Sequence, residues 1–192
     1  TFLLKEAPER WINIIKAKDD PISKCLSAST GCLLVVGNNG KLYVYETATR
    51  KRKVYGFQSA DIDPQHALLI NDNTFIVCYL GKGHENRVIQ KFTAERSHGA
   101  YVLMPGEQVY QPQISEAGSE KPLFRHMAVD SRGRVFVADI GNHCILQLST
   151  ELQLVSTLLT RGHNGISKPE RIWYDMHQNL LIVGNFTGRY ID

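Results

Sequence analysis

Short apolar runs alternate with polar turns along the chain, and the periodicity typical of helices is almost absent. Four segments share one plan, in which a run of Val, Ile, Leu or Phe leads into a turn rich in Gly and Asn and then into a second run. This plan is typical of antiparallel β-hairpins. The four segments are residues 33–46, 75–92, 135–148 and 180–192. We therefore expect an all-β chain.

Further candidate strands flank the hairpins. Upstream runs that end in tight turns are residues 68–73, 128–133 and 172–178, and downstream runs that suit outer strands are residues 52–57, 100–104 and 154–159. The middles of the first hairpin strands are Val36, Cys78, Val137 and Val183, which are 42, 59 and 46 residues apart. Four strands per roughly 40–50 residues is the spacing of a β-propeller blade, with these four as inner strands. A β-sandwich is the alternative.

We predict one domain over residues 1–192, a β-propeller of about four four-stranded antiparallel blades in an incomplete or unusually closed ring. The predicted blades are residues 18–57, 58–105, 122–160 and 168–192, and residues 1–17 are a possible outer strand of the closing blade. Residues 106–122, rich in Gln, Ser, Glu and Gly, are expected to be an extended loop. The ring could close within one chain or between two chains, and the sequence leaves this open. Self-association through unfinished blades is therefore a possible partner interaction. We expect the chain to be a segment of a longer protein.

One of the hairpins resembles a known repeat. Residues 126–148, HMAVDSRGRVFVADIGNHCILQL, are similar to an NHL repeat. The matching positions are Met127, Ala128, Val129, Asp130, Gly133, Val137, Ala138, Asp139, Asn142, His143 and Ile145. The resemblance implies a propeller of about six blades, like the C-terminal NHL domain of tripartite-motif (TRIM) ubiquitin ligases, which recognises RNA or protein. It also implies a basic residue at the start of each third strand, where this chain has Lys41, Val88, Cys144 and Arg189.

Composition narrows the function classes without choosing between them. The net charge is +3, from 22 Lys and Arg against 19 Asp and Glu. This mild excess excludes neither RNA nor protein as a partner. The basic run at residues 50–53 is either a solvated turn and outer strand or a patch that contacts phosphate. No apolar run approaches the ~20 residues of a membrane span, so we expect no membrane partner.

The sequence offers no catalytic or metal-binding constellation. The four cysteines are widely spaced without a C-x-x-C pair, which favours free thiols and a cytoplasmic protein without cofactor or metal. Cys144 is expected to be a small, half-buried filler. His143 is expected to have a structural role in its turn, and Asp130 and Asp139 are expected to accept backbone hydrogen bonds. We therefore expect a non-enzymatic segment, even if its parent were a ubiquitin ligase.

The function hypothesis is recognition of single-stranded or structured RNA by a basic propeller face. Basic side chains would hold phosphates and exposed aromatic rings would stack on unpaired bases. The candidate binding residues are Lys41, Arg87, Arg125, Arg161, Lys168, Arg171, Arg189, Tyr79 and Phe186. A protein ligand recruited by the same face, without RNA binding, is the alternative.

Overall fold

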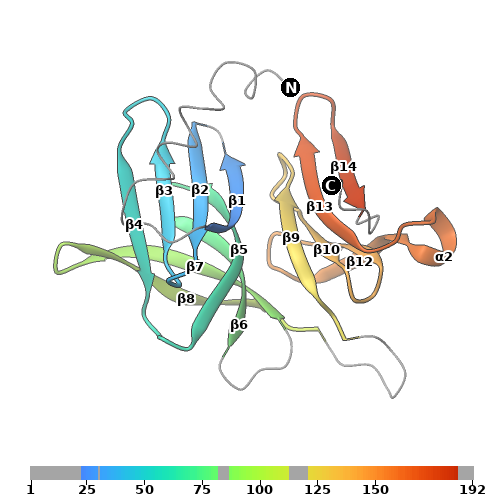
Figure 1. Ribbon diagram of the computed structural model, residues 1–192, viewed down its shortest axis with the longest axis horizontal. Helices are drawn as coiled ribbons and strands as arrows, with labels where there is room; N and C mark the ends of the chain where they lie inside the picture. Colours follow the sequence, from blue (N-terminus) through green and yellow to red (C-terminus); the bar gives the residue numbers. More distant parts are fainter. Residues whose placement is uncertain (1–22, 30, 82–86, 113–120, 186–192) are drawn as a thin grey trace, which may run out of the picture.

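The protein is almost entirely built from β-strands (Figure 1). The computed structural model describes residues 23–29, 31–81, 87–112 and 121–185. The prediction of an all-β chain is confirmed. The possible outer strand in residues 1–17, and the candidate residues Phe186 and Arg189, lie outside the described residues. Within the described part of the chain, no helix has the length and apolar character needed to cross a membrane.

Two blades of four strands form the first half of the molecule. Blade 1 consists of β1 (Ser23–Ser29), β2 (Cys32–Gly37), β3 (Leu42–Glu46) and β4 (Arg52–Phe57). Blade 2 consists of β5 (Ile62–Asn71), β6 (Thr74–Gly81), β7 (Arg87–Ser97) and β8 (Ala100–Tyr110). Consecutive strands pair antiparallel within each blade. Because β8 continues to Tyr110, the first residues of the predicted loop 106–122 are strand instead.

A third blade and a further hairpin form the second half. Blade 3 consists of β9 (Phe124–Val129), β10 (Val135–Asp139), β11 (Cys144–Leu148) and β12 (Leu154–Thr160). A short helix, α2 (Arg161–Asn164), then leads to β13 (Pro169–Asp175) and β14 (Leu180–Asn185). These two strands pair antiparallel with each other, and we call them the fourth hairpin. The prediction of at least three four-stranded blades is confirmed.

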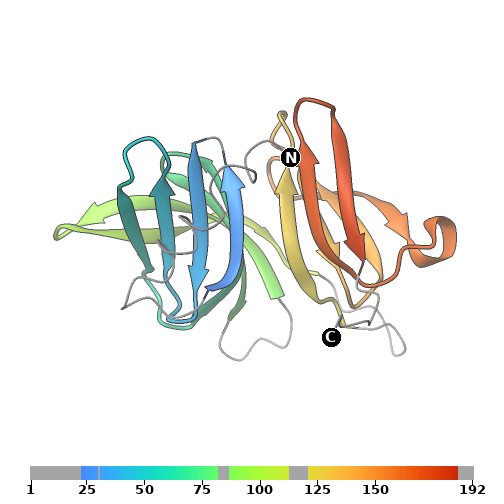
Figure 2. The ribbon, with the colours of Figure 1, turned by 45° about the horizontal axis from the view of Figure 1, so that its top comes forward.

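The blades are arranged radially, with the first strand of each blade innermost. Strand β1 contacts β5, β5 contacts β9, and β9 contacts β13. These strands lie toward the middle of the molecule, whereas β4 and β12 lie toward its two sides (Figures 1 and 2). The prediction that Val36, Cys78, Val137 and Val183 mark the inner strands is wrong, because they lie in β2, β6, β10 and β14, the second strands. An apolar run indicates that both faces of a strand are covered by other parts of the protein. This holds for the second strand of a blade as well as for the first.

The core consists of layers between consecutive blades. Strand β6 shows the principle, because Phe75 and Val77 belong to the cluster shared with blade 1, whereas Ile76 and Cys78 belong to the cluster shared with blade 3. Side chains alternate between the two faces of a strand, so an unbroken apolar run serves both layers. A third cluster joins blade 3 to the fourth hairpin. Each fully buried large side chain contributes about 1.5–3 kcal/mol.

Blades 1 and 2 are joined into one continuous sheet of eight strands. The outer strand β4 pairs parallel with the outer strand β8, with Tyr55 opposite Tyr101 and Phe57 opposite Leu103. The backbone N–H of Gln58 extends this seam by donating to Leu103 O at 3.2 Å. Two outer strands that would otherwise offer free edges therefore cover each other. Nothing in the hydrophobic pattern predicted this pairing.

Candidate functional site

One side of the molecule carries the connections between blades together with the turns between second and third strands. Antiparallel pairing brings the end of each second and fourth strand to the same side as the start of each first and third strand. We call this side the connection face and define it as residues 38–41, 58–64, 121–126, 140–143 and 161–171. The starts of β5 and β9 mark it at the bottom of Figure 1.

Exposed basic side chains outnumber carboxylates on the connection face. Its exposed basic residues are Lys41, Lys121, Arg125, Arg161, Lys168 and Arg171. Its acidic residues are Asp61, Asp63 and Glu170. Six basic against three acidic residues give this one face an excess of three positive charges, as large as the net charge of +3 of the whole chain. Such a face attracts anionic partners and raises their local concentration.

Five of the candidate residues from the sequence are exposed on this face: Lys41, Arg125, Arg161, Lys168 and Arg171. They do not form one cluster. Lys41 lies on blade 1 beside the outer strands, whereas Arg125 and Arg171 lie on the innermost strands β9 and β13. Arg161 and Lys168 flank the connection between these blades.

Arg87 corrects the expectation of a phosphate-binding loop residue. It is the first residue of β7, and its side chain is only 7% exposed. Its guanidinium donates to Phe124 O and, at 3.4 Å, to Gln65 Oε1. Burial lowers its pKa below the usual value, and the charge of Arg125 adds to this. Arg87 therefore ties blade 2 to blade 3 from the inside.

Tyr79 corrects the expectation of an exposed stacking platform. Its ring is half-buried and lies edge-on to Phe92, with centroids 6.0 Å apart. The hydroxyl donates to Gln90 Oε1 at 2.7 Å. Burial raises the pKa of Tyr79. The ring therefore packs against the core between blades 1 and 2.

Lys41 lines an open groove of about 440 Å³ at the seam of β4 and β8. Arg52, Lys53, Phe57 and Tyr101 also line it. Lys53 is paired with Glu46 at 2.8 Å, and the Arg52 guanidinium lies 5.7 Å from the centroid of the Tyr43 ring. The groove therefore combines basic side chains with half-buried aromatic rings.

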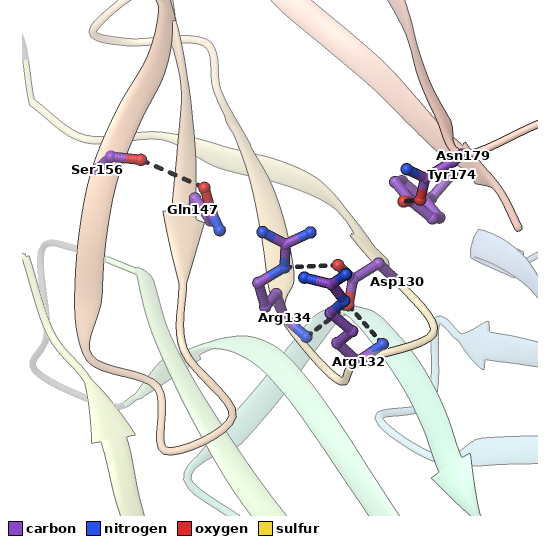
Figure 3. Close-up of polar contacts among 7 residues, drawn as sticks. All are labelled: Asp130, Arg132, Arg134, Gln147, Ser156, Tyr174 and Asn179. Carbon is purple, nitrogen blue, oxygen red and sulfur yellow. Dashed lines mark hydrogen bonds and ion pairs between the residues drawn. The ribbon is translucent and has the colours of Figure 1, made fainter.

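The two aspartates of the NHL-like repeat are structural, as predicted. Buried Asp130 holds the β9–β10 turn by accepting from the backbone N–H groups of Arg132 and Arg134 and from Arg134 Nε (Figure 3). Asp139 accepts from the Leu123 N–H at 2.9 Å and from Asn142 Nδ2 at 2.7 Å. The first bond fixes the chain where it enters blade 3.

The predicted structural role of His143 is also confirmed. The residue is buried at a positive φ of 52°, and its Nδ1 accepts the Lys168 N–H at 3.0 Å. This bond links the β10–β11 turn to the start of the fourth hairpin. Gly141 in the same turn lies against the Lys121 carbonyl so closely that a Cβ would collide with it.

Cys144 is buried more deeply than a half-buried filler. It packs in the cluster between blades 2 and 3, and burial, followed by the charge of Asp139, raises its pKa to about 12. A thiol held protonated in this way is a poor nucleophile and metal ligand. Cys32 is also a free thiol. In the described ranges, no three His, Cys, Asp or Glu residues are placed to hold a metal ion.

Sequence reasoning missed a pair of histidines on the innermost strands. His66 of β5 and His126 of β9 place their ring centroids 4.0 Å apart. Burial, followed by the nearby charge of Arg171, lowers the pKa of His126 to about 4, although hydrogen bonds with backbone groups of Ile172 and Met127 oppose the shift. Burial, then His126, then Arg171 hold the pKa of His66 well below its usual value. The sequence feature that could have revealed this pair is a histidine within the apolar first strand of each of two successive blades.

Comparison with known proteins establishes the fold. No protein-family model and no curated protein matches the chain. Among solved structures, the β-propeller domain of Cps50 (Swd1) from Myceliophteria thermophila matches with a TM-score of 0.54 and 17% identity over 86% of this chain and 51% of that one. A virginiamycin B lyase from Staphylococcus aureus matches with a TM-score of 0.47 and 13% identity over 84% of this chain and 48% of that one.

The first of these matches identifies the fold as a β-propeller, as predicted from the spacing of the hairpins. The chain spans about half the length of the propeller domain that it matches. This is consistent with three complete blades and a fourth hairpin in the described residues.

Proposed function

We propose that the chain is a non-catalytic recognition module whose connection face binds single-stranded or structured RNA. The observation that carries this proposal is the excess of exposed Lys and Arg over carboxylates on that face. Phosphate contacts from such side chains supply most of the affinity of sequence-independent nucleic-acid binding. The groove beside Lys41, with Phe57 and Tyr101 in its wall, supports the proposal because aromatic rings stack on unpaired bases.

The similarity of residues 126–148 to an NHL repeat supports the same proposal. In that family the propeller serves as the target-recognition domain of TRIM-type ubiquitin ligases. We extend the proposal to such a role in a cytoplasmic protein. The ligase activity would then lie outside the 192 residues.

A salt-dependent binding titration with single-stranded RNA tests the proposal. Lys41→Ala, Arg125→Ala and Arg161→Ala should each weaken binding, and each lost phosphate contact should reduce the slope of log affinity against log salt by about 0.7. Arg50→Ala and Lys51→Ala are the matched controls, because both residues are exposed in the β3–β4 turn on the opposite side. Equal loss in the controls, or no affinity at low salt, would overturn RNA binding by this face.

A protein ligand is the alternative, and the fourth hairpin gives a specific reason to retain it. Trp173 of β13 is 54% exposed and lies opposite Ile182 of β14, which is 50% exposed. Exposed apolar patches of this kind mark protein interaction sites, with tryptophan prominent among binding anchors. We propose that a second copy of the chain covers this face, since a blade face that no neighbouring blade covers is unfavourable in water.

Analytical ultracentrifugation tests the self-association. The 192-residue chain should sediment as a dimer or larger species, and Trp173→Ser with Ile182→Ser should shift it to monomer. Arg132→Ser, which replaces an exposed residue in the β9–β10 turn of blade 3, is the control. A chain that is monomeric before any substitution would contradict the proposal, and its RNA affinity would remain a separate question.

A further inference from the structure

The open groove at the seam of β4 and β8 owes its shape to a position without a side chain. Val54, Gly56 and Val102 all line it. Val54 and Gly56 are two residues apart on β4, and Gly56 lies opposite Val102 of β8, so the three positions share one face of the sheet. A Cβ added at Gly56 would meet no heavy atom within 4 Å beyond its two neighbours in the chain. Gly56 therefore leaves an open recess between two half-buried valines.

The volume of the groove suits a small ligand or one unit of a polymer. It is about 440 Å³, and sites for small molecules in proteins occupy about 300–1,000 Å³. Such sites combine apolar walls with a few polar groups that orient the ligand. The two valines supply apolar surface, and the half-buried side chains of Phe57 and Tyr101 add to it. The groove can therefore cover the apolar part of a ligand of this size.

The charged side chains that line the groove are all positive. They are Lys41, Arg52 and Lys53, and none of the described residues in the lining is Asp or Glu. Lys53 is paired with Glu46 at 2.8 Å, so its charge is largely compensated. Lys41 and Arg52 are exposed to solvent. Their charges favour an anionic group on the ligand.

The register of the strands brings the positive charge next to the apolar recess. Lys41 directly precedes Leu42, which lies opposite Tyr55 of β4, so Lys41 stands beside Gly56 on the neighbouring strand. Neighbouring strands are about 4.8 Å apart. A ligand in the recess can therefore reach the Lys41 ammonium with an anionic group a few bonds away. A nucleotide has this composition, because a flat base with largely apolar faces is joined through a sugar to a phosphate.

We propose that the groove binds one nucleotide with an unpaired base, with the base in the recess at Gly56 and the phosphate at Lys41. A base inside a duplex has both faces covered by its neighbours in the stack, so only an unpaired base can enter. As part of an RNA strand this nucleotide would occupy a defined subsite, and to that extent the inference rests on the proposed function. A free nucleotide offers the same chemistry, and the experiments below distinguish the two sources.

Titration of the 192-residue chain with adenosine monophosphate, followed through methyl signals in NMR, tests the site. The signals of Val54 and Val102 should shift and saturate, whereas those of Val137, buried in the core between blades 2 and 3, should not. Adenosine and inorganic phosphate should each bind about tenfold more weakly or worse, because each makes only part of the contacts. Equal shifts with inorganic phosphate would overturn the site for the base, and shifts that do not saturate would overturn the site altogether.

Gly56→Val fills the recess and is the decisive variant. Valine is favourable in strands and its Cβ meets open space, so the fold should tolerate it. It should weaken adenosine monophosphate binding about tenfold or more, and Gly56→Ala should weaken it less. Thr157→Val, on the exposed outer strand of blade 3, is the control. If Gly56→Val does not fold, Lys41→Ala decides, because it should weaken binding of the monophosphate but not of adenosine, and equal affinity for the monophosphate in Lys41→Ala and the control would overturn the site.

Single-stranded RNA separates the two sources of the nucleotide. Gly56→Val should weaken binding of a single-stranded oligonucleotide but not of a duplex, and the slope of log affinity against log salt should stay the same because no cation is removed. RNA affinity that falls in Arg125→Ala but not in Gly56→Val would leave RNA binding in place and overturn the groove as its nucleotide site. Saturation by adenosine monophosphate without any RNA affinity would assign the groove to a free nucleotide and overturn the proposed function. Saturation by tetraglutamate but not by the monophosphate would overturn the nucleotide in favour of an acidic peptide.

Discussion

Blade 3 and the fourth hairpin have the same sequence plan but different burial. Strand β10, VFVAD, is buried at every residue, and Phe136 is only 4% exposed. Strand β14, LLIVGN, is at least as apolar, yet its side chains alternate between half-buried and exposed. Blade 3 packs against blade 2 on one face and the fourth hairpin on the other. The comparison shows that an apolar run predicts a strand that can be covered on both faces. The rest of the fold determines whether one face or both are covered.

The largest expected difference between the two regions is the response to truncation of an apolar side chain. Phe136 stacks on Tyr174 with ring centroids 5.5 Å apart, in the layer between blade 3 and the fourth hairpin. Phe136→Ala should lower the free energy of unfolding by about 3–5 kcal/mol through lost burial and the cavity that remains. Ile182→Ala should lower it by less than about 1 kcal/mol. Urea denaturation of dilute, monomeric samples measures both, and similar losses would show that Ile182 is buried within the monomer.

The aspartate turns give the next largest contrast. Asp130 is buried and accepts three hydrogen bonds, one of them from Arg134 Nε at 2.6 Å. Asp130→Ala should destabilise the protein by about 2–4 kcal/mol, because it removes the buried acceptor of all three hydrogen bonds that hold the turn. Asp175, in the β13–β14 turn, accepts the N–H groups of His177 and Gln178, which water can reach. Asp175→Ala should therefore destabilise the protein clearly less than Asp130→Ala does.

Acid stability extends the comparison to histidines. The folded pKa of His126 is about 4, below the unfolded value near 6.5, so the unfolded chain binds more protons between these limits. The free energy of unfolding should therefore fall by about 1–3 kcal/mol from pH 6.5 to pH 4.5, and burial of His66 acts in the same direction. His126→Phe should flatten this dependence, whereas His177→Phe should preserve it. Urea midpoints measured across this range would refute the assignment if both variants retained the wild-type slope.

The smallest expected effect on stability concerns the exposed face of the fourth hairpin. Trp173→Ser should change the free energy of unfolding of the monomer by less than about 1 kcal/mol, because surface substitutions are usually nearly neutral. The same substitution in a buried layer, as in Phe136→Ser, should prevent stable folding. Denaturation of dilute, monomeric samples measures both, and a large loss for Trp173→Ser would mean that the ring is buried within the monomer.

The sequence was sufficient to predict the fold because each hairpin carries its own local signals. Apolar runs, turn residues and a step of 42–59 residues between hairpins specify blades without any knowledge of long-range contacts. The roles of Asp130, Asp139 and His143 were also predictable, because they satisfy backbone groups within a few residues or at the next blade. The order of the strands within a blade, from the axis outward, was not predictable, because second strands are as apolar as first strands.

The site was predicted less well because a basic residue in the sequence carries no information about its depth. Arg87 follows the polar run GKGHEN yet is buried against Phe124 O, whereas Arg125 follows the apolar Leu123 and Phe124 yet is exposed. The position expected from the repeat to be basic is Cys144, which the fold encloses between blades 2 and 3. The His66–His126 pair depends on the packing of two innermost strands, and their separation of 60 residues hides it from any local pattern.

The parallel seam of β4 and β8 makes blades 1 and 2 a single mechanical body. A backbone ladder joins these two blades, whereas blade 3 meets blade 2 mainly through side-chain packing. Local opening follows the weakest boundary in a structure, so β1 to β8 should exchange their protected amide hydrogens as one cooperative unit. Blade 3 and the fourth hairpin should then open separately from this unit, because side-chain packing and not a backbone ladder joins them to blade 2.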